Sequence, residues 1–100
     1  MVELRLSDEA ASDLDEIKTS GIERFGPAAA DRHLLGLRHG IASLTANPFL
    51  GQERPEFRQG IRSLSRRPHR ILYSATDELV IVVRVLHHAR DVNDALSGEA

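Results

Sequence analysis

The sequence predicts an α+β fold: an N-terminal strand, an antiparallel helical hairpin, a three-stranded antiparallel meander that completes the sheet, and a short C-terminal helix. Three observations lead to this class. An alternating apolar segment opens the chain, two amphipathic helical patterns follow it, and three strand patterns joined by short turns come next. The last three strands are expected to be antiparallel because their connections are too short for a crossover. At 100 residues, the chain is expected to form one domain over 1–100.

The first strand and the first helix are separated by a single capping residue. Residues 2–6 alternate apolar and polar side chains, which predicts a half-buried strand. Ser7 is the expected N-cap of the helix that follows. Gly21 lies within this helix and would permit close approach of another element. Asp13 and Glu16 are close together on the same helix and are interpreted as a solvated acidic face rather than as a catalytic acid–base pair. The apolar stripe recurs at helical spacing: Ala10, Leu14, Ile17, Gly21 and Phe25.

A Gly-Pro pair marks the turn of the helical hairpin. Gly26 suits the left-handed position after a helix, and Pro27 suits the first position of the next one. The second helix is expected to run from there to Asn47-Pro48 and to fold back on the first. Its inward-facing stripe has the same spacing: Ala30, Leu34, Leu37, Ile41 and Leu44.

The second half of the chain has strand patterns. Residues 48–60 contain two prolines and two glycines and are expected to form a loop. Residues 61–66 and 69–75 are expected to be strands, and the long apolar run that starts at residue 79 and ends with two histidines is expected to be the central strand. Asp91 is a plausible N-cap for a short last helix.

One charge interrupts the central strand, and such a charge is costly unless it is paired or reaches water. Strand alternation places Arg84 on one face of the sheet and residues 81, 83 and 85 on the other. If the helices cover that odd-numbered face, Arg84 opens onto an uncovered face, where Arg62 and Arg66 could join it. The alternative is that Arg84 pairs with Asp91 and braces the end of the strand.

Composition excludes several classes of function. There is no cysteine, and no apolar run is long enough to span a membrane. The cytoplasm is therefore the expected compartment. The five histidines have unsuitable spacing for metal ligands, and no glycine-rich phosphate loop is present, so no metal or cofactor is expected. Residues 54–70 contain six arginines and one glutamate, which suits an acidic partner or a nucleic acid.

One ordered set of positions runs through the chain: Leu6-Ser7, Ala10, Asp13-Leu14, Ile17, Phe25-Gly26, Ala30, Leu44, Asn47-Pro48, Gly51, Gly60-Ile61-Arg62, His69, Tyr73, Arg84-Val85-Leu86-His87 and Asp91. This set resembles the ParE toxins of the RelE/ParE superfamily over about residues 6–96. The resemblance implies a toxin of a type II toxin–antitoxin pair with a RelE/ParE-like fold. It implies a ParD-like antitoxin partner with a ribbon-helix-helix part, and DNA gyrase as a target that is blocked without enzymatic chemistry.

Two sets of site residues follow. If the protein acts as ParE toxins do, it is a binding protein in a hetero-oligomer, and it contacts nucleic acid only indirectly through the antitoxin. The alternative is a RelE-like, ribosome-dependent mRNA endoribonuclease that uses Arg62, Arg84 and His87. Few aromatic side chains and a single lysine disfavour this alternative. The residues predicted to bind antitoxin or target are Arg58, Arg62, Arg66, Arg67, His69, Arg84, His88 and Arg90.

Overall fold

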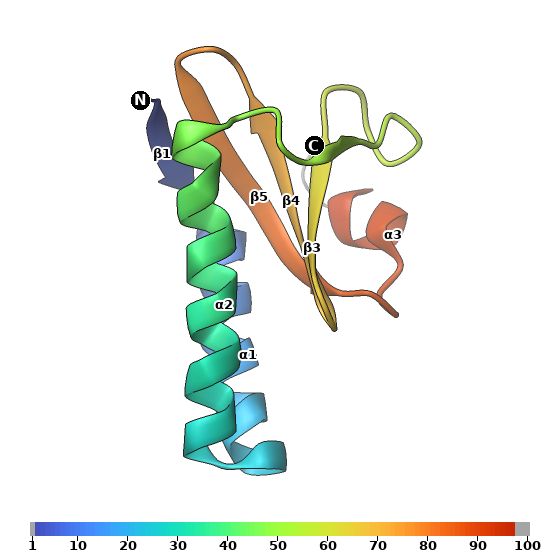
Figure 1. Ribbon diagram of the computed structural model, residues 1–100. Helices are drawn as coiled ribbons and strands as arrows, with labels where there is room; N and C mark the ends of the chain where they lie inside the picture. Colours follow the sequence, from blue (N-terminus) through green and yellow to red (C-terminus); the bar gives the residue numbers. More distant parts are fainter. Residues whose placement is uncertain (1, 98–100) are drawn as a thin grey trace.

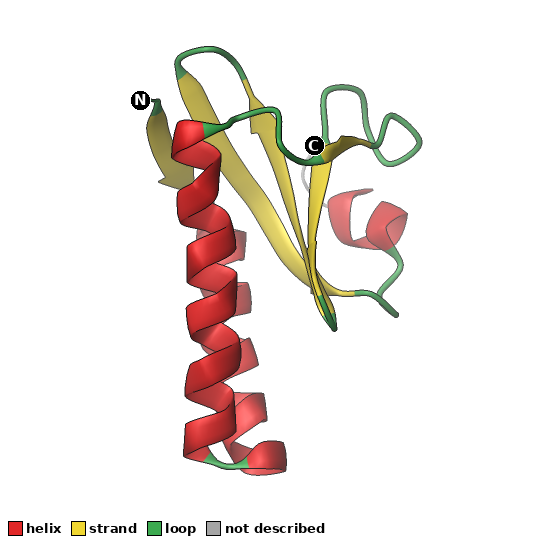
Figure 2. Ribbon diagram, in the orientation of Figure 1, coloured by secondary structure: helices red, strands yellow, loops and turns green. Residues whose placement is uncertain are grey.

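The computed structural model describes residues 2–97, and its order of elements agrees with the predicted one, with one short strand added (Figures 1 and 2). The elements are β1 Glu3–Leu6, α1 Asp8–Phe25, α2 Pro27–Ala46, β2 Gln52–Glu53, β3 Arg62–Arg66, β4 His69–Ala75, β5 Leu79–His87 and α3 Val92–Ser97. None of the helices in residues 2–97 has both the length and the apolar character needed to cross a bilayer.

The five strands form one sheet in the order β1-β5-β4-β3-β2. The predicted meander is confirmed, because β3, β4 and β5 pair antiparallel. The first strand completes the sheet by pairing parallel with β5. The expectation that residues 48–60 are all loop is wrong at β2, which pairs antiparallel with β3. Two residues are too few to leave a periodic pattern in the sequence.

The predicted helix boundaries are confirmed by local geometry. The hydroxyl of Ser7 accepts a hydrogen bond from the backbone N–H of Ala10 at 2.9 Å. Gly26 has a positive φ of 88°, and Pro27 occupies the first turn of α2. Gly21 lets the helices approach, because a Cβ at that position would lie 3.2 Å from the Cβ of Ala30.

The sheet has an apolar core on each face. The larger core lies under the hairpin and includes Leu37, Tyr73 and Val82, all fully buried. The smaller core lies under α3 and includes Leu72 and Val83. The two faces are therefore both covered, although the second is covered only by one short helix and part of the loop before β3.

A β-bulge in β5 explains why the predicted alternation fails there. Leu72 is opposite Arg84 and Tyr73 is opposite Val82, so the residue between Val82 and Arg84 has no partner in β4. This extra residue reverses the alternation. Val82 and Val85 both face the hairpin, while Val83 faces α3. The expectation that the helices cover positions 81, 83 and 85 is therefore wrong for the first two.

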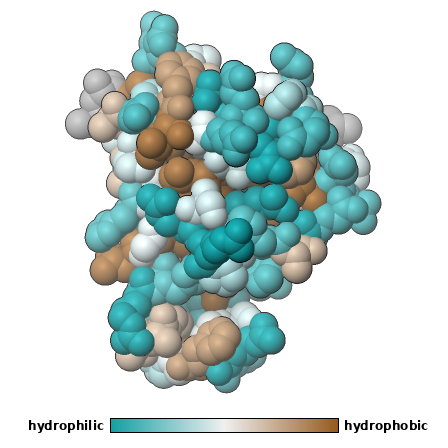
Figure 3. Space-filling model, turned by 45° about the vertical axis from the view of Figure 1, so that its right-hand side comes forward, coloured by the Kyte–Doolittle hydropathy of each residue, from teal (hydrophilic) through white to brown (hydrophobic). Residues whose placement is uncertain are grey.

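The hairpin extends beyond the end of the sheet (Figure 1). At its tip Phe25, which the apolar stripe predicts to face inward, is 71% exposed. The sheet is shorter than the helices, so there is no strand for this ring to pack on. Figure 3 shows apolar surface between hydrophilic side chains on the projecting tip. The tip is thus the part of the hairpin whose inner face has no strand beneath it.

Candidate partner-binding groove

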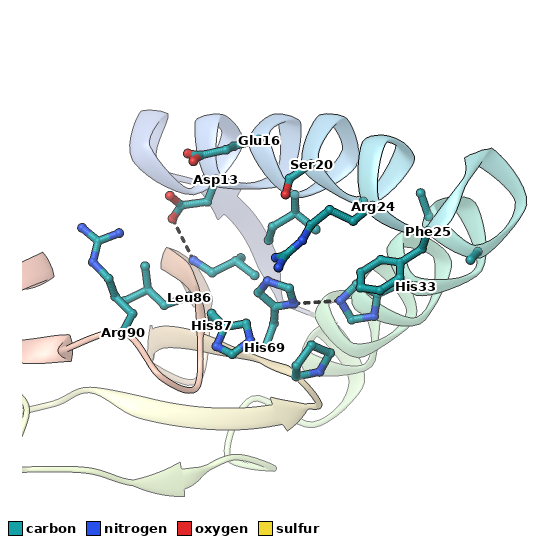
Figure 4. A pocket seen from close by; sticks show the side chains of 16 residues that line it. Asp13, Glu16, Ser20, Arg24, Phe25, His33, His69, Leu86, His87 and Arg90 are labelled. Carbon is teal, nitrogen blue, oxygen red and sulfur yellow. Dashed lines mark hydrogen bonds between the residues drawn. The ribbon is translucent and has the colours of Figure 1, made fainter.

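A groove of about 600 Å³ lies between the tip half of the hairpin and the neighbouring ends of β4 and β5 (Figure 4). One wall is formed by α1, which contributes Glu16 and Arg24 among others, and by His33 of α2. The other wall contains His69 at the start of β4 and Arg90 in the turn after β5. The groove combines apolar surface with positively charged and titratable side chains.

An ion pair between α1 and β5 includes Asp13, which is one of the groove residues. Arg84 donates from Nε to Asp13 Oδ2 at 2.8 Å and from Nη2 to Asp13 Oδ1 at 2.9 Å. The backbone N–H of Val85 donates to the same carboxylate at 3.0 Å. The side chains of Arg84 and Asp13 are only 13% and 11% exposed. Bidentate pairs of this kind are the strongest charge-assisted contacts in proteins.

Asp13 accepts a hydrogen bond from the edge of β5 where no neighbouring strand is paired. β1 pairs with β5 only as far as Val82, so beyond this point β5 has an unpaired edge. The carboxylate of Asp13 satisfies the Val85 N–H on that edge. Arg84 also donates from Nη1 to the carbonyl of Ala95 in α3 at 3.2 Å. The pair therefore connects the hairpin, the sheet and the C-terminal helix.

These contacts correct three expectations about single residues. Arg84 does not lie on an uncovered face with Arg62 and Arg66, because its guanidinium reaches round the free edge of β5 to α1. Its observed carboxylate partner is Asp13, whereas Asp91 caps α3 by accepting from the N–H of Asp94 at 3.2 Å. The N-cap prediction for Asp91 is confirmed. Asp13 is largely buried and ion-paired and does not belong to a solvated acidic face.

A pair of histidines joins the hairpin to the sheet nearer the tip. His33 Nε2 and His69 Nδ1 are 2.8 Å apart and hydrogen-bonded. Their ring centroids are 4.9 Å apart, and the ring of His87 meets that of His69 edge-on at 5.4 Å. Figure 4 shows His33 reaching across from the helical wall of the groove.

Both histidines of the pair titrate below their ordinary range. Burial lowers the pKa of His69 to about 4, and the charges of His33, His87 and His88 contribute to the same shift. Burial also lowers the pKa of His33. His69 is therefore neutral at pH 7, and the shift of His33 also favours its neutral form.

The structure gathers only part of the predicted binding set in the groove. His69 and Arg90 line it, and so does His87 from the alternative nuclease set. Arg58 and Arg67 are exposed in the turns before and after β3. The others have structural contacts elsewhere: Arg62 donates to the carbonyl of Gly51 at 2.7 Å, Arg66 donates to the carbonyl of Ser65 at 2.8 Å, and His88 lies 3.2 Å from the hydroxyl of Ser65.

The three residues of the alternative nuclease set do not converge. Arg62 in β3 is opposite Tyr73 in β4, which is opposite Val82 in β5. His87 is opposite His69, four residues from Tyr73 along β4, so it is two strands away from Arg62 and roughly 13 Å further along the sheet. The guanidinium of Arg84 is held by Asp13 and Ala95. No common point for a scissile phosphate is formed by these side chains.

Sequence reasoning missed Arg24 and His33 as groove residues, and it misread Asp13. All three positions carry a recognisable signal. Asp13, Arg24 and His33 lie three or four residues from stripe positions on the inward faces of α1 and α2. A polar residue on an apolar stripe is expected to have a partner. Within residues 2–97 no group of three or more potential ligands has the geometry to hold a metal ion.

Solved structures share this fold. It matches a chain of the chromosomal ParDE toxin–antitoxin system from P. aeruginosa with a TM-score of 0.74 and 24% identity, covering 87% of this chain and 96% of the other. It also matches a chain of the toxin–antitoxin complex RelBE2 from Mycobacterium tuberculosis with a TM-score of 0.61 and 24% identity, covering 87% and 98%. The α+β fold is thus that of the RelE/ParE toxins, as predicted.

Sequence comparison then gives the family. The family model described as "ParE toxin of type II toxin-antitoxin system, parDE" matches residues 4–92. Toxin ParE1 of Mycobacterium tuberculosis (strain H37Rv) is 40% identical over 89 residues, which cover 88% of this chain and 91% of that toxin. Toxin ParE3 of Caulobacter vibrioides is 32% identical over 76 residues, which cover 76% of each. The chain belongs to the ParE toxin family of type II toxin–antitoxin systems.

Proposed function

We propose that this toxin inhibits DNA gyrase in the cytoplasm and that a ParD-like ribbon-helix-helix antitoxin neutralises it by tight binding. The observation that supports this most strongly is the ParE family match, which spans residues 4–92. The relatives that are 32–40% identical carry the same family name. The proposed activity is one of binding, because a gyrase inhibitor of this family needs a surface rather than a catalytic centre.

The groove is the surface proposed for the antitoxin. Its walls include apolar side chains, such as Ile17, Phe25 and Ala29, and its rim carries Arg24 and Arg90. An amphipathic segment could bury its apolar side chains between these walls while its acidic side chains meet the arginines. Nucleic acid would then be contacted only through the ribbon-helix-helix part of the antitoxin.

The geometry gives no support to the endoribonuclease alternative. The residues proposed for it lie on different parts of the sheet, and the guanidinium of Arg84 is already bound to a carboxylate. A phosphate would have to displace Asp13 before it could reach that guanidinium in a bidentate manner.

A supercoiling assay tests the proposed function. Purified gyrase is given relaxed plasmid with the toxin, with the toxin plus its cognate antitoxin, or with neither. We expect the toxin to suppress supercoiling and the antitoxin to restore it, and we expect induction in cells to arrest growth while transcripts remain intact. Normal supercoiling in the presence of the toxin, together with cleaved transcripts in induced cells, would contradict the proposal.

A further inference from the structure

The His33–His69 pair has two ring nitrogens that its internal hydrogen bond does not use. The bond joins His33 Nε2 to His69 Nδ1. Among residues 2–97, no group is hydrogen-bonded to His33 Nδ1 or to His69 Nε2. In the neutral pair one of these two nitrogens carries a hydrogen and the other is an acceptor, whichever tautomers are present.

One added proton changes this pattern without breaking the pair. A protonated imidazole donates to a neutral one, so the hydrogen bond between the rings persists. Both remaining nitrogens then become N–H donors. The pair is thus a site that can gain a proton and offer two donors to an anion. A second proton would put donors on both sides of the 2.8 Å contact and would break it.

The groove around the pair carries more unpaired positive charge than negative charge. Asp13 is neutralised by Arg84, so Glu16 is the remaining acidic residue in the groove. Opposing it are Arg24 of α1 and Arg90 beyond β5, which have no ion pair within residues 2–97. The groups that face the pair from α1, β3, β5 and the turn after β5 are Asp13, Glu16, Arg24, Arg66, His87, His88 and Arg90.

We propose that the His33–His69 pair is a carboxylate-binding site for an acidic side chain of the antitoxin and that it takes up one proton as the complex forms. This inference rests on the proposed function, because the antitoxin is the partner that brings the carboxylate. The argument for an acidic occupant is charge complementarity with Arg24, Arg90 and the pair itself. An apolar side chain at the same place would leave the imidazoles neutral and would take up no proton.

Proton uptake gives the binding a defined dependence on pH. In the free toxin the pKa of His69 lies at about 4, so the His69 ring is neutral throughout the range from pH 5.5 to 7.5. A bound carboxylate favours the charged form and raises this pKa. If it returns to the ordinary value for histidine, roughly 6.5, the affinity for the antitoxin increases about tenfold from pH 7.5 to pH 5.5.

The test is a calorimetric titration of the full-length toxin with its full-length cognate antitoxin. Affinities are measured at pH 7.5, 6.5 and 5.5, and at pH 6 the titration is repeated in two buffers with different ionisation enthalpies to count the protons taken up. The variants are His33→Gln and His69→Gln, which retain polar side chains that do not titrate. His39→Gln is the matched control, because His39 is exposed on the same helix and does not line the groove.

The expected result is about tenfold tighter binding at pH 5.5 with net proton uptake, in the native toxin and in His39→Gln alike. His33→Gln and His69→Gln should lose the tightening and the proton uptake. Circular dichroism at each pH confirms that every variant is folded. Tight binding that is independent of pH, or that weakens on acidification, would overturn the inference and leave the proposed function standing. Absence of any binding would overturn both.

Discussion

Two polar contacts join the hairpin to the sheet, Asp13–Arg84 near its base and His33–His69 nearer its tip, and they differ in strength and in accessibility. The first is a bidentate ion pair that also takes a backbone N–H from β5. The second is a single hydrogen bond between two imidazoles in a half-exposed groove. The hairpin and the sheet are thus joined near the base by a contact whose carboxylate oxygens all have donors, and nearer the tip by a contact that leaves two ring nitrogens unused.

The difference separates a structural role from a binding role. Both carboxylate oxygens of Asp13 already accept hydrogen bonds within the toxin, so we do not expect a partner to bind there. The histidine pair retains two unused nitrogens and lies beside exposed apolar and cationic side chains. We therefore expect substitutions at the ion pair to act mainly on stability, and substitutions around the histidine pair to act mainly on binding.

The largest effect on stability is expected from Arg84→Ala. This change leaves the carboxylate of Asp13 largely buried without its counter-ion, which costs about 3 kcal/mol of unfolding free energy. Urea denaturation measures it. Arg32→Ala, which removes an exposed arginine from α2, is the control and should change stability by less than about 0.5 kcal/mol. A loss below about 1 kcal/mol for Arg84→Ala would show that the pair does not hold the fold together.

A smaller loss is expected from Gly21→Val, which disturbs the hairpin beside the groove. The Cβ of the new side chain would lie 3.2 Å from the Cβ of Ala30, so the two helices would have to separate. The expected cost is about 1–2 kcal/mol. Gly36→Val is the matched control, because nothing lies within 4 Å of a Cβ at that position. Equal stability of the two variants in urea would contradict the close approach of α1 and α2.

Acidification should also lower stability through the histidine pair. The folded pKa of His69 is about 4, below the ordinary value of 6.5, so the unfolded chain binds more protons between these values. The contribution to stability is complete above pH 6.5 and is lost as the pH falls towards 4. Thermal unfolding from pH 7.5 to 4.5 measures the loss. His69→Gln should show a shallower decline than the native protein, and identical slopes would refute the assignment.

The smallest effect on stability is expected from Phe25→Ser, because the ring is 71% exposed. The unfolding free energy should change by less than about 0.5 kcal/mol. The affinity for the antitoxin should nevertheless fall by about tenfold, because the ring is an apolar anchor in the groove. Leu35→Ser is the control: Leu35 is 53% exposed on α2 but does not line the groove. Equal affinities for the two variants would place the antitoxin elsewhere.

Most of the fold can be predicted from local signals. Ser7, Gly26-Pro27 and Asp91 mark helix ends through their own backbone chemistry, and the structure has a cap or a turn at each. The strand alternation also holds in most places. It fails in β5 because the residue between Val82 and Arg84 has no partner in β4, so the side chains after it in β5 change face. A bulge of this kind leaves no signal in the local sequence.

The groove was less predictable, because its residues come from four separate segments. The sequence shows that Arg84 is a charge that needs a partner, but that partner is Asp13, which lies 71 residues away in the sequence. Spacing along one element cannot identify a contact of this kind. The polar positions on the apolar stripes, Asp13 and His33, show where such partners should be sought.

The most direct test of the division between the two contacts is the NMR spectrum of the histidine side chains during titration with the antitoxin. We expect the imidazole signals of His33, His69 and His87 to shift as the complex forms, because these rings line the groove. The signals of His39 should remain unchanged. Formation of a tight complex without a shift at His33 or His69 would contradict the account, since the antitoxin would then occupy another surface.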